Sequence, residues 1–276
     1  MNAVPQPDVI RNRDGMWFSR LRSYLIINNL IYLYTIVLGT LSLLSSFVDR
    51  SGRIQHGFAR LWSFLILKTS GIRVQISGLE KPPSHSVVYA VNHASALDIP
   101  TLYWHIPSQF RIMAKKELFR YPFMGWHLTR SGQIPIEREN ARSSLRSLNR
   151  ASEALKSGMP LLVFPEGGRS ADGTIKPFLP GAFYVAIKAG AEIVPIVLVG
   201  TRERLPMNSF HIVPGDVEML VGDPIATAGL VPRDMDILAA RVQNKIENMY
   251  YSRAAYPDPR NAPNLDREQS VLRSDQ

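Results

Sequence analysis

Two short polar segments of the sequence carry the residue types that acid–base chemistry requires. The first, NHASALD at residues 92–98, places His93 five positions before Asp98. On one continuous helix this spacing turns the two side chains about 140° apart, so they would not meet. They can meet if His93 lies in a turn after a strand and Asp98 in the first turn of the next helix, which Pro100 allows. The carboxylate would then fix the imidazole tautomer and leave the other ring nitrogen to accept a proton from a hydroxyl.

The second segment is FPEGGRS at residues 164–170, which combines glycines with charged side chains. Gly167 and Gly168 let the backbone approach a ligand closely, because neither carries a Cβ. Arg169 offers a planar fork of donors that suits a phosphate group. Taken alone, the second segment indicates a turn with a surface Glu–Arg pair, and the first a histidine that caps a buried turn.

Composition excludes several other kinds of chemistry. The chain has 276 residues and no cysteine, so disulfides, a thiol nucleophile and cysteine-based metal sites are excluded. The six histidines show no metal-ligand spacing, and we expect no metal site. With 32 Lys and Arg against 23 Asp and Glu, the net charge of +9 favours a negatively charged partner: phosphate, an anionic membrane surface or nucleic acid.

The elements that must position the two segments follow from hydrophobic periodicity. Nearly continuous aliphatic runs predict strands buried on both faces at residues 87–91, 161–164 and 193–199. Helical patterns closed by glycine predict helices at residues 140–156 and 181–189. This alternation predicts an α/β fold with a mostly parallel sheet flanked by helices. Ligands bind at the carboxyl ends of the strands in such sheets, and each polar segment follows a predicted strand.

A different pattern precedes this domain. Residues 24–48 contain no charged side chain, and the run exceeds the roughly 20 residues that span a bilayer. Residues 54–67 show the periodicity of an amphipathic helix. Because arginines flank the first run on both sides, we expect a two-helix membrane-binding motif that enters one leaflet and returns. A single span, a signal peptide and a buried core helix are the alternatives.

The patterns divide the chain into four regions. We expect one catalytic-sized domain, because the hydrophobic content of 45% shows no seam that would divide the core. Prolines among charged residues predict a disordered C-terminal segment. The regions are a basic N-terminal tail at 1–23, membrane-associated helices at 24–70, a catalytic domain at 71–255 and a disordered tail at 256–276.

Taken in order, these segments resemble the glycerophosphate and lysophospholipid acyltransferase family. NHASALD is similar to its NHxxxxD block, and SGQIPIER, FPEGGRS and IVPIVLVG to its second, third and fourth blocks. KKEL at 115–118 and KPFLPGAF at 176–183 fit its KKEL-like and KxFKxGAF-like stretches. The resemblance covers residues 74–225. Three positions depart from the usual pattern without removing an ionisable group: Gly168 replaces threonine, Pro135 phenylalanine and Leu198 proline.

The resemblance implies a set of roles. His93 would be the general base and Asp98 its orienting carboxylate, so that a hydroxyl attacks the thioester directly without an acyl-enzyme. Backbone amides near Gly167 and Gly168 are candidate donors to the developing oxyanion. Substrate-binding residues would be Lys115, Arg138 and Arg169 around the acceptor phosphate, with Glu166 and Gly167 shaping the site beside it.

The reaction implied is transfer of a fatty acyl group from acyl-CoA or acyl-carrier protein to the sn-2 hydroxyl of 1-acyl-glycerol-3-phosphate, which forms phosphatidic acid. No cofactor is implied. The expected location is the cytoplasmic face of a membrane, the inner membrane if the source is bacterial. Alternatives are another lysophospholipid or lyso-aminolipid acceptor, and a catalytically silent membrane-binding protein. We expect no nucleic-acid partner, because aromatic and basic residues are not interleaved on one surface.

Overall fold

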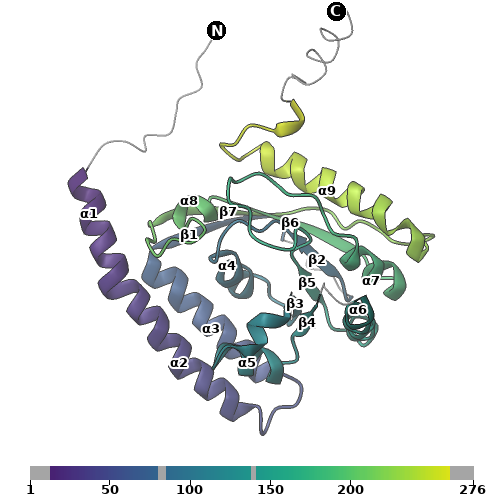
Figure 1. Cartoon of the computed structure of the whole chain (residues 1–276), viewed down its shortest axis with the longest axis horizontal. Helices are drawn as coiled ribbons and strands as arrows, with labels where there is room; N and C mark the ends of the chain where they lie inside the picture. The colour runs from purple at the N-terminus through teal and green to yellow at the C-terminus, as the bar shows by residue number, and fades with distance from the viewer. Residues whose placement is uncertain (1–12, 80–84, 138–140, 262–276) are drawn as a thin grey trace, which may run out of the picture.

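The computed structural model describes residues 13–79, 85–137 and 141–261 (Figure 1). It begins with a continuous helix, formed by α1 (Arg13–Arg22), a π-helical turn (Ser23–Ile27) and α2 (Asn28–Ser45). The stretch Trp17–Ser45 is long and apolar enough to cross a membrane, by length and composition alone. Helix α3 (Arg53–Ser70) returns beside α2, joined to it by hydrogen bonds from the Trp62 indole to Thr35 at 3.0 Å and between the Tyr34 and Thr69 hydroxyls at 3.2 Å.

A seven-stranded sheet forms the centre of the described residues. Its spatial order is β1-β7-β6-β2-β5-β3-β4, and within it only the neighbours β6 and β7 are antiparallel. The predicted fold class, a mostly parallel α/β sheet flanked by helices, is confirmed. The strands are β1 (Ile72–Ser77), β2 (Val88–Val91), β3 (Arg111–Lys115), β4 (Ile134–Ile136), β5 (Leu161–Val163), β6 (Ile193–Val199) and β7 (Gly215–Val221).

Helices cover both faces of the sheet (Figure 1). Besides α1 to α3, they are α4 (Asp98–His105), α5 (Met124–Arg130), α6 (Ala141–Lys156), α7 (Gly181–Ala189), α8 (Thr201–Arg204) and α9 (Met235–Tyr251), with short 3-10 turns η2 (Lys116–Arg120), η3 (Pro232–Asp234) and η4 (Pro259–Asn261). In β2, Val88 and Ala90 belong to the core formed with α6, α7 and α9, whereas Tyr89 and Val91 belong to the core formed with α3 and α4. Because successive side chains alternate between two buried faces, the strand is a continuous apolar run in the sequence.

The strand directions explain why distant segments meet. Strands β6, β2, β5, β3 and β4 run parallel, so their carboxyl ends lie along one edge of the sheet. NHASALD follows β2, FPEGGRS follows β5 and KKEL follows the end of β3. The polar segments found in the sequence therefore gather at this edge.

Two regions differ from the boundaries predicted at the ends of the chain. The first helix already begins at Arg13, inside the range expected to be a tail. At the other end, the ring of Tyr256 stacks on Tyr250 with centroids 6.4 Å apart, and its hydroxyl accepts a hydrogen bond from Arg202 at 2.7 Å. The fold therefore continues to residue 261, and the boundary predicted at residue 256 falls too early.

Candidate active site

The structure brings His93 and Asp98 together in the way that the spacing required. Strand β2 ends at Val91, His93 lies in the following turn, and Asp98 is the first residue of α4. The Nδ1 atom of His93 lies 2.7 Å from Oδ2 of Asp98, which is fully buried. Because a carboxylate only accepts hydrogen bonds, Nδ1 carries the proton. Nε2 of His93 makes no hydrogen bond with a described residue and is left to accept one.

The backbone around this pair is fixed at several points. Oδ2 of Asp98 also accepts the amide N–H groups of Ala94 and Ser95, each at 2.9 Å. The Ser95 hydroxyl donates to the carbonyl of Leu205 at 2.8 Å. Asn92 closes a two-way bridge to the end of β6, accepting from the Leu198 amide at 2.8 Å and donating to the Leu198 carbonyl at 3.0 Å. Asn92 and Ser95 are not among the site residues predicted from the sequence, although both belong to the NHASALD segment.

The Glu166 carboxylate is hydrogen-bonded to the backbone of the turn that carries His93. One carboxylate oxygen accepts the amide of His93 at 2.6 Å, and the other accepts the amide of Lys176 at 2.9 Å. Burial raises the pKa of Glu166 to about 7, against the opposing effect of these two hydrogen bonds and of the Lys176 charge. The structure thus places Glu166 behind His93, as a link between two loops.

The turn after β5 lies against His93. The ring of Phe164 stacks on the imidazole with centroids 4.0 Å apart, and the Ser170 amide donates to the His93 carbonyl at 2.7 Å. Gly167 adopts the left-handed conformation, with φ of 74°, which favours glycine there. Its amide donates within the turn to the Phe164 carbonyl, whereas the Gly168 amide makes no hydrogen bond with a described residue. Of the two candidate oxyanion donors, only Gly168 is therefore free.

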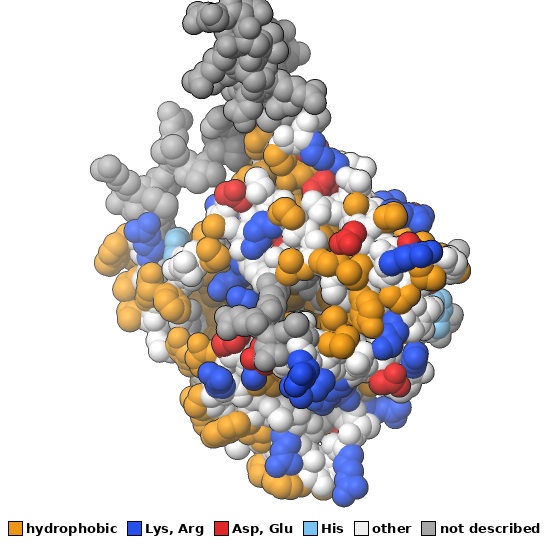
Figure 2. Space-filling model, turned by 45° about the vertical axis from the view of Figure 1, so that its right-hand side comes forward, with side chains coloured by type: hydrophobic (Ala, Val, Ile, Leu, Met, Phe, Trp, Pro, Cys, Tyr) orange, Lys and Arg blue, Asp and Glu red, His pale blue; other side chains and the backbone are white. Residues whose placement is uncertain are grey.

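Two of the predicted phosphate-binding cations lie at this edge of the sheet. Arg169 is half-buried in the turn after β5, and Lys115 is exposed at the end of the neighbouring strand β3. Neither side chain pairs with a carboxylate among the described residues, in contrast to Lys116, which lies 2.8 Å from Glu137. The predicted site residue Arg138 lies outside the described residues. Figure 2 shows basic side chains spread among apolar ones over one face of the molecule.

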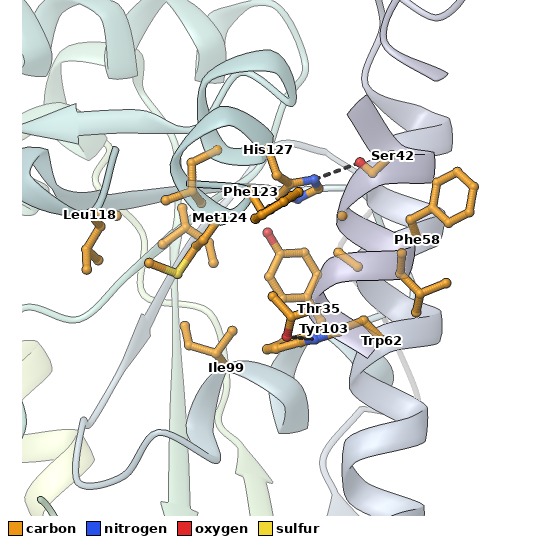
Figure 3. Close-up of a pocket in the computed structure, with 16 residues that line it drawn as sticks. Thr35, Ser42, Phe58, Trp62, Ile99, Tyr103, Leu118, Phe123, Met124 and His127 are labelled. Carbon is orange, nitrogen blue, oxygen red and sulfur yellow. Dashed lines mark hydrogen bonds between the residues drawn. The ribbon is translucent and has the colours of Figure 1, made fainter. Parts of the chain in front are cut away.

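An apolar cavity of about 200 Å³ lies between the N-terminal helices and the sheet (Figure 3). Its wall joins residues of α2 and α3 to residues of α4, β3 and α5. Inside it the Ser42 hydroxyl lies 2.7 Å from Nδ1 of His127, whose pKa burial lowers to about 4. The imidazole is therefore neutral at pH 7. A Cβ added to Gly39, which lines the cavity, would lie 3.7 Å from the Phe123 Cβ across it.

A second cavity of about 280 Å³ lies on the other face of the sheet, beside the turn after β5. Phe164 and Pro165 form part of its wall. The rest comes from residues of β3, β4, β5, α6 and α7 and from Leu179, with Ser144 the one polar side chain among the residues that line it.

Together these features place a buried histidine–aspartate pair beside a glycine-rich turn with an unpaired arginine, at the carboxyl edge of an α/β sheet. Residues 73–199 match the family model described as Acyltransferase. The chain belongs to the acyltransferase family.

Named relatives agree with this assignment. The chain is 37% identical over 202 residues to the chloroplastic 1-acyl-sn-glycerol-3-phosphate acyltransferase BAT2 of Brassica napus, covering 72% of this chain and 57% of that protein. It is 31% identical over 182 residues to the human 1-acyl-sn-glycerol-3-phosphate acyltransferase alpha, covering 65% and 64%. The chain thus spans little more than half the length of the first of these relatives.

A solved structure has a similar fold. The 1-acyl-sn-glycerophosphate acyltransferase PlsC from Thermotoga maritima superimposes with a TM-score of 0.71 and 23% identity, over 85% of this chain and 95% of that one. The structural match therefore extends beyond residues 73–199, which match the family model.

Proposed function

We propose that this chain transfers a fatty acyl group from acyl-CoA or acyl-carrier protein to the sn-2 hydroxyl of 1-acyl-glycerol-3-phosphate, forming phosphatidic acid at a membrane surface. The observation that carries the proposal is the His93–Asp98 pair, with Nε2 free and the unpaired Arg169 in the adjoining turn. The names of the relatives support the choice of acceptor.

The reaction follows from the direction of the hydrogen bonds. Nε2 of His93 takes the proton of the acceptor hydroxyl while its oxygen attacks the thioester carbonyl carbon. The buried carboxylate of Asp98 stabilises the imidazolium that forms. The tetrahedral species then collapses, the C–S bond breaks, and the proton passes from Nε2 to the departing thiolate. An ester and a thiol leave, and the sequence of steps requires neither a cofactor nor an acyl-enzyme.

Charges beside the histidine give the acceptor its orientation. The guanidinium of Arg169 suits the phosphate, with Lys115 further along the edge of the sheet and Arg138 as a third predicted cation. The Gly168 amide is the donor that we assign to the oxyanion of the tetrahedral species.

The N-terminal helices support the proposed location at a membrane. Apolar side chains gather along the edge of the molecule where α1 and α2 lie (Figure 1, Figure 2), and Trp17, Tyr32 and Phe47 are more than half exposed. Such a face is suited to lie in a lipid interface. The cavity behind α2 is apolar enough to hold a hydrocarbon chain of a substrate.

The test is an acyl-transfer assay with purified protein in lipid vesicles. Because the chain has no cysteine, a thiol-reactive dye reports only the thiol released from the donor. We expect release with 1-acyl-glycerol-3-phosphate, formation of phosphatidic acid by mass spectrometry, and loss of both in His93→Ala. Transfer only to another lysolipid would correct the acceptor, and no transfer by folded protein to any acceptor would refute the enzyme assignment.

A further inference from the structure

Lys176 lies beside the turn after β5 and has no role in the mechanism above. Its backbone amide and that of His93 donate to the two oxygens of one carboxylate, Glu166, at 2.9 and 2.6 Å. The Glu166 carboxylate therefore bridges the backbone of Lys176 and the backbone of His93. Its side chain folds back over the turn after β5, and Nζ donates to the carbonyl of Arg169 at 3.1 Å.

The charge of Lys176 is not neutralised by a paired carboxylate. An ammonium has three donors, and the bond to the Arg169 carbonyl uses one of them. Glu166 is the nearby acid, but both of its oxygens already accept backbone amides. Among the described residues, Lys176 forms no ion pair. Half-buried cations without a counter-charge are suited to bind an anionic ligand, as the neighbouring Arg169 is.

Gly168 leaves the space beside this ammonium open. A Cβ added to Gly168 would lie 3.7 Å from Nζ of Lys176, an ordinary contact distance, so a side chain there would lie against the ammonium. In the family pattern that the sequence resembles, threonine usually stands at this position. Lys176 is the one cation of residues 176–183.

We propose that Lys176 is a phosphate-binding residue, which with Arg169 holds the phosphate monoester of the acceptor in the space that Gly168 leaves open. The inference rests on the proposed function and adds a binding residue to it. Arg169 supplies a planar fork, and Lys176 supplies a point charge beside the same turn. With no side chain at Gly168, the ammonium of Lys176 faces this space directly and can make a charge-assisted hydrogen bond to phosphate.

The key variant is Lys176→Gln, which keeps an N–H donor for the Arg169 carbonyl but removes the charge. We expect it to raise the KM for 1-acyl-glycerol-3-phosphate by roughly 10- to 100-fold, the range for one hydrogen bond to a charged group. The KM of the thioester donor and the kcat at saturating acceptor should stay near those of the unchanged protein. Lys176→Arg should recover most of the loss.

Lys188→Gln is the matched control. Lys188 is a half-buried lysine of α7 whose Nζ also donates to a neutral oxygen, Oδ1 of Asn149 at 2.7 Å, and it lies over the ring of Tyr184. Its loss should leave the acceptor KM unchanged. Gly168→Thr added to Lys176→Gln should restore part of the acceptor affinity, since a hydroxyl then enters the open space.

Each outcome decides a separate point. If the unchanged protein acylates 1-acyl-glycerol-3-phosphate and Lys176→Gln leaves the acceptor KM unaltered, Lys176 is not a phosphate ligand, while the proposed function stands. A lower kcat at unchanged KM would show that Lys176 only positions the turn. A raised KM for the donor would show that the Lys176 charge binds the phosphate groups of the thioester donor. If the unchanged protein acylates no lysophospholipid, the proposed function fails first.

Discussion

Asp98→Asn separates the orienting role of Asp98 from its charge. Oδ2 of Asp98 accepts three hydrogen bonds, from Nδ1 of His93 at 2.7 Å and from the amides of Ala94 and Ser95 at 2.9 Å. Oδ1 is buried and makes no hydrogen bond with a described residue. In the variant, the amide oxygen must therefore take the place of Oδ2, where three donors converge, and the NH₂ group that of Oδ1. The imidazole keeps its tautomer, and only the charge is lost.

The expected loss in rate is modest. A hydrogen bond to a charged group contributes about 1.5–3 kcal/mol and one between neutral groups about 0.5–1.5 kcal/mol. The difference of roughly 1–1.5 kcal/mol corresponds to about a tenfold fall in kcat. His93→Ala removes the base itself and should cost about 10²- to 10⁴-fold. The buried NH₂ group, left without an acceptor, should also lower the free energy of unfolding by about 1–3 kcal/mol.

The thiol-release assay measures both rates, and thermal unfolding confirms that each variant is folded. If folded Asp98→Asn is as inactive as His93→Ala, the tautomer has changed and the argument from three converging donors is wrong. If kcat does not fall, the charge of Asp98 has no part in stabilising the imidazolium.

Four further results are expected. Arg169→Ala should raise the acceptor KM by roughly 10- to 100-fold, with partial rescue by lysine, and a change confined to the donor KM would place Arg169 on the thioester. Gly39→Leu should shift the preference to shorter acyl chains in assays with graded substrates, whereas an unaltered preference would place the chain outside this cavity. The folded-state pKa of Glu166 is about 7, above the ordinary value of 4.5, so the native protein binds this proton more tightly than the unfolded chain does. The free energy of unfolding should therefore fall by roughly 3 kcal/mol as the pH rises from 4.5 to 7. Denaturant unfolding of Glu166→Gln should lack this decline, and parallel pH profiles would contradict it. Single cysteines at Asn2 and Ser252 should be labelled from the same side of sealed vesicles, and labelling from opposite sides would establish a membrane span instead.

The strands that could be predicted from the sequence are those buried on both faces of the sheet, because burial makes their residues apolar throughout. β6 was predicted at residues 193–199 and is found there, because burial on both faces makes every position apolar. β7 (Gly215–Val221) was not predicted, because Asp216 and Glu218 interrupt its apolar residues. β4 has only three residues and contains Pro135, which argues against a strand. Periodicity fails for such elements because their neighbours in the sheet, and not their own composition, make them strands.

The contact between His93 and Asp98 was predictable from local spacing, but the contacts that support the pair were not. His93 and Asp98 lie in one loop, so the geometry of a strand, a turn and a helix limits how they can meet. Glu166 contacts the backbone of His93, and Lys176 that of Glu166's turn, only because β5 lies next to β2 in the sheet. The sequence suggested that Glu166 shapes the site, whereas the structure places its carboxylate on two backbone amides. Contacts of this kind depend on strand order, which the linear pattern did not contain.

The long N-terminal helix is part of the catalytic fold as well as an apolar surface. The buried hydroxyl of Ser23, in the π-helical turn, accepts the amide of Ile212 at 3.2 Å, and Asn28 donates to the carbonyl of Phe210 at 2.9 Å. These bonds fix the helix to the loop before β7. Farther along the same helix, Gly39 and Ser42 form part of the cavity wall (Figure 3). A hydrocarbon chain that moved from a bilayer around α2 into this cavity would avoid exposure to water, a cost of about 0.8 kcal/mol per CH₂ group. The helix that would contact lipid is therefore also the helix that encloses the cavity.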